Sequence, residues 1–170
     1  MDSFQTQSVI NESTFRALRK YLMPRKQKLF FFACIALFAV LLVISIITKY
    51  NSVIVVLALG IIVLTTEYFI LLNRLVKISV NRLQETAHSK ESLHETSLTD
   101  TGFKMINHST NGAAIIDYND IVRFVETEKF YALFTKANQF GIINRQTIDE
   151  ANKKEALVTF LKERCKKIRW

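Results

Sequence analysis

The sequence predicts an α+β membrane protein, in which a two-helix transmembrane hairpin is followed by a small antiparallel β meander that a C-terminal amphipathic helix closes. Three observations lead to this expectation. Two apolar runs of 20 residues each, 29–48 and 53–72, lie only four residues apart. Short segments rich in β-forming residues, separated by turn residues, come after them. The chain then ends in apolar residues at helical spacing.

Length and polarity divide the chain into four expected parts. Residues 1–28 form a cytoplasmic N-terminal segment with a short amphipathic helix, and residues 29–72 form the hairpin. Each apolar run is about 30 Å long as a helix, which matches the hydrocarbon thickness of a bilayer. Residues 73–91 continue as a juxtamembrane helix, and residues 92–170 are long enough for one small cytoplasmic domain with its own core.

The N-terminal segment contains a weak strand pattern followed by a helix pattern. The stretch 4–10, FQTQSVI, alternates between polar and apolar residues, and Asn11 to Ser13 supply helix caps. We expect a helix over 14–23 that ends at Pro24. Its apolar face could lie in the lipid headgroups or pack on the rest of the protein, and the second interpretation is the simpler one.

The distribution of charge predicts the topology. The net charge is +8, and both polar flanks of the hairpin are basic. Arg74, Lys77 and Arg82 follow the second run, whereas the connecting loop carries only Lys49. By the positive-inside rule, both termini of this two-span protein of the cell membrane are cytoplasmic. Topology thus accounts for the basic balance, and we expect no nucleic-acid partner.

Glu67 is the only residue within either apolar run whose side chain is ordinarily charged at neutral pH. It lies about 7 Å past the centre of its span, toward the cytoplasmic end. A carboxylate in a membrane is by default a functional hypothesis, such as a transport path. One carboxylate does not make such a path, and two helices cannot enclose one without oligomerising. A structural or assembly role is therefore favoured over transport.

The segment after residue 91 predicts a meander. The expected strands are 94–97, 103–107, 113–117, 121–126, 130–135 and 139–144, with turns between them. Thr147 and Glu150 have the spacing of a capping box, which predicts the start of the C-terminal helix. A meander closed by one such helix is the plan of a pleckstrin-homology-like (PH-like) barrel.

A search for chemistry finds no catalytic motif. The three histidines lack metal-ligand spacing, the four glycines are isolated, and Asp117 and Asp120 flank a turn where aspartate is common. Neither Cys34 nor Cys165 suggests a disulfide in a cytoplasmic context. We therefore expect no enzyme, no metal site and no cofactor.

Three basic residues of the expected domain could contact a membrane or a partner. Arg123 alternates with apolar neighbours on a strand and should face solvent, while Lys129 and Lys136 lie in or beside turns. Together they could form an anion-binding rim. A solvated basic surface near an anionic leaflet is the simpler interpretation.

The chain resembles the YcxB-like family of bacterial membrane proteins over most of its length. The resemblance rests on SVINESTFRALRK at 8–20, the hairpin, IIDYNDIVRFVETEKFYALF at 115–134 and IINRQTI at 142–148. Tyr118 stands where such families often carry Trp, and Asn144 where they often carry Pro. The resemblance implies a hairpin with a C-terminal PH-like domain, and it supplies no catalytic residues.

Three functions are compatible with these features. The first is a membrane-anchored, non-enzymatic interaction or regulatory module, whose PH-like domain binds a protein partner or the inner leaflet. The second is an immunity protein against a membrane-active bacteriocin, and the third is a small transport-associated subunit that uses Glu67. The expected partners are the lipid bilayer, a membrane or cytoplasmic protein, and a second copy of the chain.

Overall fold

The computed structural model describes residues 4–137, 139–150, 153–166 and 168 of the 170-residue chain. Its residues form two compact units. One unit comprises Met1–Ala17 together with Val80–Trp170, and the other comprises Leu18–Ser79. The second unit is therefore an insertion in the sequence of the first.

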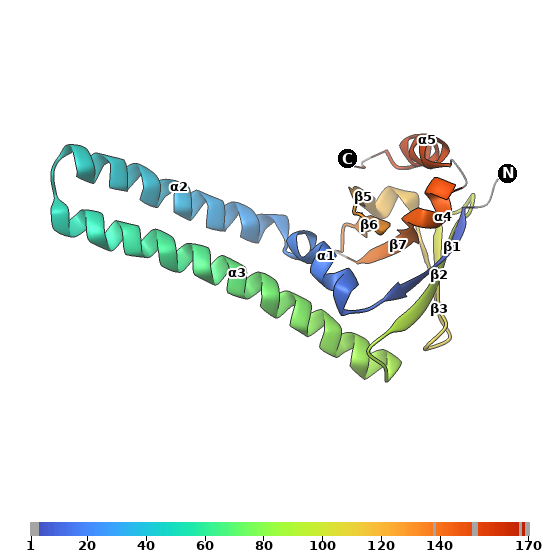
Figure 1. Cartoon of the computed structure of the whole chain (residues 1–170). Helices are drawn as coiled ribbons and strands as arrows, with labels where there is room; N and C mark the ends of the chain where they lie inside the picture. The colour runs from blue at the N-terminus through green and yellow to red at the C-terminus, as the bar shows by residue number, and fades with distance from the viewer. Residues whose placement is uncertain (1–3, 138, 151–152, 167, 169–170) are drawn as a thin grey trace. The chain divides into compact units, whose positions relative to one another are not determined.

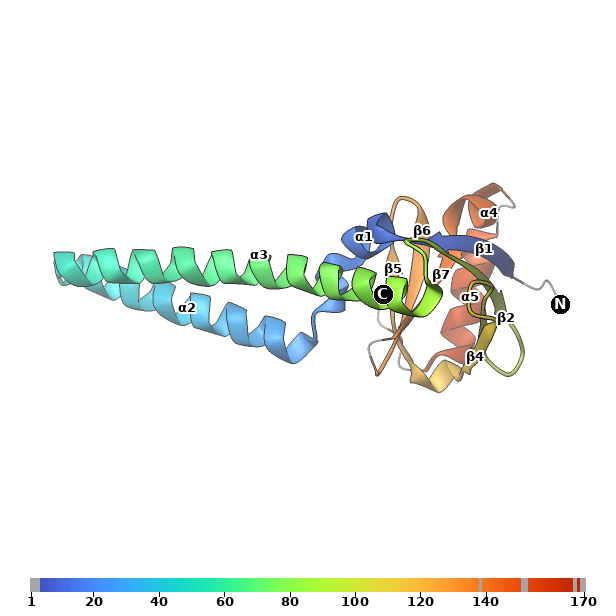
Figure 2. The same ribbon diagram turned by 90° about the horizontal axis from the view of Figure 1, so that it is seen from below.

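The inserted unit is a hairpin of two long apolar helices, α2 (Arg25–Ile47) and α3 (Asn51–Ala87), the second of which continues into the other unit. Both are long and apolar enough to cross a membrane. They run side by side in opposite directions (Figures 1 and 2). The Tyr68 ring packs against Phe31 at 5.7 Å, and the Phe38 ring fills the space that Gly60 leaves, where a Cβ atom would approach it to 2.5 Å.

The two helices α2 and α3 correspond to the three expected helical segments 29–48, 53–72 and 73–91. The expected juxtamembrane helix is the direct continuation of the second apolar helix, because α3 runs without a break to Ala87. Before the hairpin, α1 (Glu12–Leu22) confirms the expected amphipathic helix. Asn11 caps it, since its side-chain oxygen accepts a hydrogen bond from the Thr14 amide at 3.3 Å.

The first sheet has four strands in the order β1-β2-β3-β4. These are β1 (Gln5–Ile10), β2 (Ser92–Leu98), β3 (Phe103–Asn107) and β4 (Gly112–Ile116). The weak pattern near the N-terminus is thus a full strand, and β1 pairs antiparallel with β2 across the whole inserted hairpin. Each of the other pairs is a local hairpin, and the β3–β4 turn places Asn111 at a positive φ of 51°, which asparagine tolerates.

The second sheet has three strands, β5 (Ile121–Glu126), β6 (Phe130–Thr135) and β7 (Phe140–Asn144). The expected antiparallel strands are therefore confirmed in part: the described strands form two sheets, and no closed barrel is detected among them. The change of sheet occurs at the 3₁₀ turn η1 (Tyr118–Asp120). The buried Tyr118 hydroxyl fixes this corner by donating a hydrogen bond to the Thr99 carbonyl at 2.6 Å.

Polar and apolar contacts join the two sheets. The Thr96 hydroxyl of β2 donates to the Ile142 carbonyl of β7 at 2.8 Å, and the Asn144 amide donates to the Thr6 hydroxyl at 3.2 Å. One apolar core lies between the sheets and the C-terminal helices. Its fully buried members include Phe103, Tyr131, Leu133, Leu157 and Leu161.

The C-terminal region contains two helices, α4 (Arg145–Glu150) and α5 (Lys154–Arg164), instead of one. The predicted capping box is wrong: the helix starts before Thr147, and the Asn144 side chain accepts the hydrogen bond from the Gln146 amide at 3.0 Å. The apolar stripe is nevertheless used as expected, because Leu157 and Leu161 of α5 are buried in the core shared by both sheets.

Candidate functional site

The three basic residues proposed as a rim do not lie together. Lys129 precedes β6 and Lys136 follows it, so the six-residue strand separates them by about 20 Å. Lys136 forms an ion pair with Asp120 at 2.8 Å. The Arg123 guanidinium lies 5.2 Å from the centre of the Phe134 ring, and Arg123 is half-buried because a register shift between Ile121 and Arg123 interrupts the alternation of β5.

Lys129 borders a shallow cleft of about 580 Å³ next to α4. The cleft carries both charge signs in nearly equal number. Its lining residues are Glu128, Lys129, Asn144, Arg145, Gln146, Asp149 and Glu150. Because three acidic and two basic side chains line it, this cleft is not an anion site of the kind that a basic rim would form.

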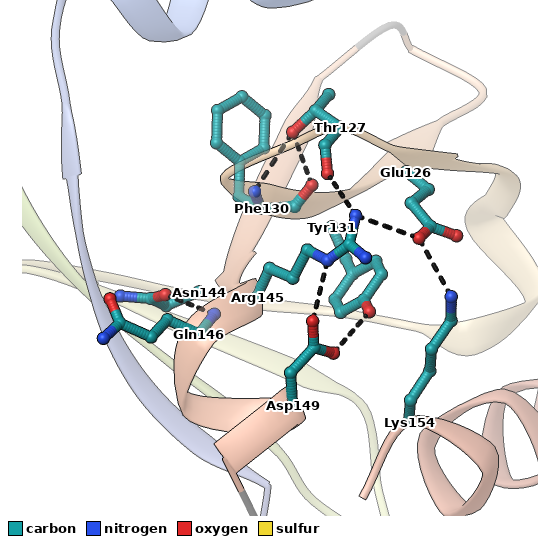
Figure 3. A network of polar contacts seen from close by, with 9 residues as sticks. All are labelled: Glu126, Thr127, Phe130, Tyr131, Asn144, Arg145, Gln146, Asp149 and Lys154. Carbon is teal, nitrogen blue, oxygen red and sulfur yellow. Dashed lines mark hydrogen bonds and ion pairs between the residues drawn. The ribbon is translucent and has the colours of Figure 1, made fainter. Parts of the chain in front are cut away.

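The most connected polar cluster lies at one side of this cleft and centres on Arg145 (Figure 3). The Arg145 Nε donates to Asp149 at 2.8 Å, and its Nη1 lies 3.1 Å from both the Thr127 carbonyl and Glu126. Lys154 of α5 reaches the same Glu126 oxygen at 2.9 Å. Through these contacts the cluster ties α4 and α5 to the end of the β5–β6 hairpin.

Tyr131 lies beneath this cluster and is fully buried. Its hydroxyl donates to Asp149 at 3.0 Å, and burial together with this carboxylate raises the pKa of Tyr131 to about 12. The hydrogen bond from Arg145 holds the pKa of Asp149 below its ordinary value. Arg145, Asp149, Tyr131 and Glu126 are thus engaged with one another, and their contacts connect the helices to the β5–β6 hairpin.

The sequence did not reveal that His94, on β2, lies close enough to His108, just after β3, for the two rings to interact. His108 follows β3 and lies 3.0 Å from Glu95, whereas His94 of β2 is half-buried and lies 3.1 Å from the Ser92 hydroxyl. Burial, followed by the charge of His108, lowers the pKa of His94. Within the described ranges, no three His, Cys, Asp or Glu side chains are placed to hold a metal ion.

Asp117 and Asp120 have the turn role that the sequence favours. The Asp117 carboxylate accepts a hydrogen bond from the Asn119 amide at 2.7 Å and so caps η1. Asp120 is engaged with Lys136. The two carboxylates therefore serve the corner between the sheets.

Glu67 lies on α3 within the hairpin unit and is exposed. The neighbouring hydroxyls of Thr65 and Thr66 each donate to a carbonyl one turn earlier, at 2.8 Å. The structure therefore leaves the carboxylate outside the contact between α2 and α3, and it has no ion pair among the described residues.

An exposed sheet edge is a further candidate that sequence analysis missed. β4 is the last strand of its sheet, and its residues Gly112 to Ile115 are all exposed. The side chain of Ile115 is 64% exposed, and the strand GAAII carries no charge and no proline. The uncharged, proline-free composition of this strand was visible in the sequence, but only the strand order shows that β4 is an edge strand.

These features define a class of protein: a small two-sheet domain that carries two apolar helices inserted between its first two strands. Within that class, residues 98–161 match the family described as YcxB-like protein, so the chain contains a YcxB-like domain. The match runs from the end of β2 into α5 and includes the runs 115–134 and 142–148, whereas the run 8–20 and the hairpin lie outside it. No curated protein and no solved structure matches the chain.

Proposed function

We propose that this protein is a membrane-anchored, non-enzymatic interaction module whose PH-like domain binds a protein partner along β4. The exposed, uncharged edge of β4 is the observation that carries this proposal. An unpaired strand edge offers a row of backbone donors and acceptors, and an extended peptide can add to it as a further strand.

The composition of β4 favours a partner over a free edge. Soluble proteins commonly protect sheet edges with lysine, proline or a bulge, and β4 has none of these. Its outward side chains include Ala113 and Ile115, which are small or apolar. The ligand that fits them is an extended, uncharged and largely apolar segment of another protein.

The inserted hairpin supports membrane anchoring. α2 and α3 have the length and apolarity of membrane spans, and their large side chains are mostly exposed, as lipid-facing residues would be. Basic residues at the outer ends of the hairpin favour cytoplasmic termini in the cell membrane. Sheets of four and three strands with a packed C-terminal helix favour a PH-like domain, here with an open form.

Binding to the inner leaflet is the less favoured alternative. That function needs basic groups gathered on one surface, whereas Arg123, Lys129 and Lys136 lie apart, and Lys136 is paired with Asp120. A protein partner therefore accounts better for the surface of this domain.

Photo-crosslinking in living cells tests the proposal. A photoreactive amino acid at Ala113 in the full chain should give one dominant protein adduct, which mass spectrometry identifies. Ile115→Lys should reduce that adduct at least tenfold, because a charge on an edge strand opposes strand addition. Leu93→Lys is the matched control: Leu93 is 39% exposed and lies on β2, an interior strand of the same sheet. Adducts only to lipid, or equal losses in both variants, would contradict the proposal.

A further inference from the structure

Exposed basic side chains gather at the end of the helical hairpin where α2 begins. In the unit Leu18–Ser79, they occupy two short stretches, 18–28 and 73–79, which lie just outside the two apolar runs and contain no Asp or Glu. Six of these side chains are exposed and have no ion pair within the described part of the chain. We call this group the basic collar, and its members are Arg19, Lys20, Arg25, Lys26, Arg74 and Lys77. The opposite end of the hairpin carries only Lys49.

The contact between the two long helices brings both stretches of the collar to one level. The Tyr68 ring of α3 lies 5.7 Å from the Phe31 ring of α2, and the two helices run in opposite directions (Figure 1). Arg25 comes six residues before Phe31, and Arg74 comes six residues after Tyr68. Each arginine is therefore about 9 Å along its helix from the ring contact, and both lie on the same side of it.

The second half of α1 belongs to the same unit and adds two members to the collar. The Lys28 ammonium group lies 5.6 Å from the centre of the Tyr21 ring, which links the end of α1 to the first turns of α2. Arg19 and Lys20 are exposed, whereas the larger apolar side chains of this region are buried. These buried residues are Leu18, Leu22, Leu72 and Val76. Three helices of one unit thus contribute exposed cations to the collar.

The collar lies at the depth of the lipid headgroups if the hairpin spans a membrane, as proposed above. Arg25 is four residues before the first apolar run and Arg74 is two residues after the second, which is about 6 Å and about 3 Å along a helix. The headgroup region is about 5–8 Å thick on each side of the hydrocarbon. The phosphate group of a lipid is therefore within reach of these arginine side chains.

The charge of the collar determines which kind of headgroup fits it. Within the unit, the nearest carboxylate in sequence is that of Glu67, about 10 Å before Arg74 along α3. The collar therefore contains six cations and no anion of its own. A zwitterionic headgroup brings its own cation beside the phosphate, whereas an anionic headgroup brings a net negative charge. Charge complementarity thus favours an anionic phospholipid.

We propose that the basic collar binds an anionic phospholipid of the cytoplasmic leaflet, with the lipid phosphate held by Arg25 and Arg74. A guanidinium group can form two parallel hydrogen bonds with phosphate oxygens, and the lysines of the collar add to the attraction. The bound lipid belongs to the membrane anchor and not to the PH-like domain. This inference rests on the membrane anchoring in the proposed function and is independent of the partner at β4.

Native mass spectrometry of the full-length protein in a neutral detergent tests the lipid site. Phosphatidylglycerol and phosphatidylcholine with the same acyl chains are added in equal amounts, and bound phosphatidylglycerol should exceed bound phosphatidylcholine about tenfold or more. Arg25→Gln combined with Arg74→Gln should lower this ratio about fivefold or more, whereas Arg25→Lys combined with Arg74→Lys, which keeps both charges, should lower it less. Lys90→Gln combined with Lys166→Gln is the matched control, because it removes two charges from exposed positions of the other unit and should leave the ratio unchanged.

Equal binding of the two lipids, or equal losses in the arginine-to-glutamine variant and in the control, would overturn the lipid site. An excess of inorganic phosphate should leave the bound phosphatidylglycerol in place, and its displacement would identify a soluble anion as the ligand and overturn the proposal as well. Alkaline carbonate treatment of native membranes separates this failure from failure of the proposed function. Release of the chain would contradict membrane anchoring and the lipid site together, whereas a retained chain without lipid preference would contradict only the lipid site.

Discussion

At the residue scale, Tyr131 connects the polar cluster around Arg145 with the apolar core. Its ring stacks on Phe124 at 5.4 Å, and its hydroxyl reaches Asp149 of α4. The same side chain therefore belongs to the apolar core and to the contacts that hold α4. This double role makes the phenol a sensitive reporter of whether α4 stays in place.

We predict that Tyr131→Phe reduces the loss of folding stability that the protein undergoes as the pH rises into the alkaline range. The pKa of Tyr131 is raised from 10.0 to about 12 in the folded state, mainly by burial. Its contribution is therefore fully present below pH 10 and is lost as the pH rises toward 12. The Phe variant should lose about 1 kcal/mol near neutral pH with the hydrogen bond to Asp149, and should then fall less steeply in alkali.

Denaturant unfolding of the protein in detergent at several alkaline pH values measures this effect. Tyr118, whose pKa is also raised to about 12, accounts for a remaining alkaline loss. Tyr50→Phe is the matched control, because Tyr50 is 64% exposed between the two long helices. An alkaline profile of Tyr131→Phe identical to that of the parent would contradict the prediction.

His94 gives a separate prediction at acidic pH. Burial lowers the pKa of His94 below 6.5, so the folded state prefers the neutral ring. The corresponding stability is present above pH 6.5 and is lost as the pH falls through the lower folded pKa. His94→Gln should therefore show a smaller drop in melting temperature between about pH 7.5 and about pH 5 than the parent. His88→Gln, at an exposed position, should leave that drop unchanged.

Residue roles set by neighbours in sequence were predictable, and roles set by distant neighbours were not. Asp117 has a turn function because its carboxylate accepts a hydrogen bond from the backbone amide of Asn119, only two residues later in the chain. The solvent-facing position expected for Arg123 fails because a register shift in β5 and the Phe134 ring on the next strand decide it. The contact of Tyr131 with Asp149 spans 18 residues and no local pattern signals it.

At the scale of elements, the length of the apolar runs was enough to find the two long helices, whereas pairing decided the strands. The apolar runs predict α2 and α3 because an apolar run of this length has few other structures available to it. The division of the meander into two sheets depends instead on the corner at Tyr118, whose hydroxyl binds the Thr99 carbonyl 19 residues earlier. A turn signal alone does not tell whether the next strand pairs with the previous one.

β7 provides a test of how tightly the two sheets pack. Gly141 is buried, and a Cβ atom there would lie 2.0 Å from the Phe103 ring and 2.5 Å from the Met105 sulfur. Phe103 is fully buried and has no room to yield. Gly141→Ala should thus destabilise the protein by about 1–3 kcal/mol. Gly112→Ala, whose nearest contact is the Thr110 hydroxyl at 3.2 Å, should change the free energy of unfolding much less.

Denaturant unfolding of both glycine variants, monitored by circular dichroism, distinguishes a clash in tight packing from a change in β propensity. Both glycines lie in strands, so a loss of β propensity alone would affect them alike. Equal midpoints for Gly141→Ala and the parent would show that the sheets have space between them at Phe103.

At the scale of the whole molecule, the main finding is that the helical hairpin is inserted between two paired strands. β1 and β2 are neighbours in the sheet, yet residues 11–91 separate them in sequence. Sequence patterns locate each segment but do not show that the first strand pairs with a strand that begins after 81 intervening residues. This pairing means that the inserted segment, residues 11–91, leaves the sheet after Ile10 and returns to it at the opposite residue, Ser92.

The insertion predicts that a short turn can replace the whole hairpin. Ile10 lies opposite Ser92 at the end of the β1–β2 ladder, so a two-residue Asn-Gly turn has the right length to join them. The fused chain lacks Phe15, whose ring lies 5.8 Å from the Phe140 ring, and it therefore carries Phe140→Thr to avoid an exposed aromatic ring. This chain should be soluble and should unfold cooperatively.

A chain of residues 92–170 with the same Phe140→Thr substitution is the matched control. It lacks Thr6, whose hydroxyl accepts a hydrogen bond from the Asn144 amide. It also lacks the buried side chains of Phe4 and Ile10. Thermal unfolding should therefore begin at a clearly lower temperature than in the fusion. If the two chains melt alike, β1 adds nothing to the domain, and if neither melts cooperatively, the domain depends on the removed segment, residues 11–91, to fold.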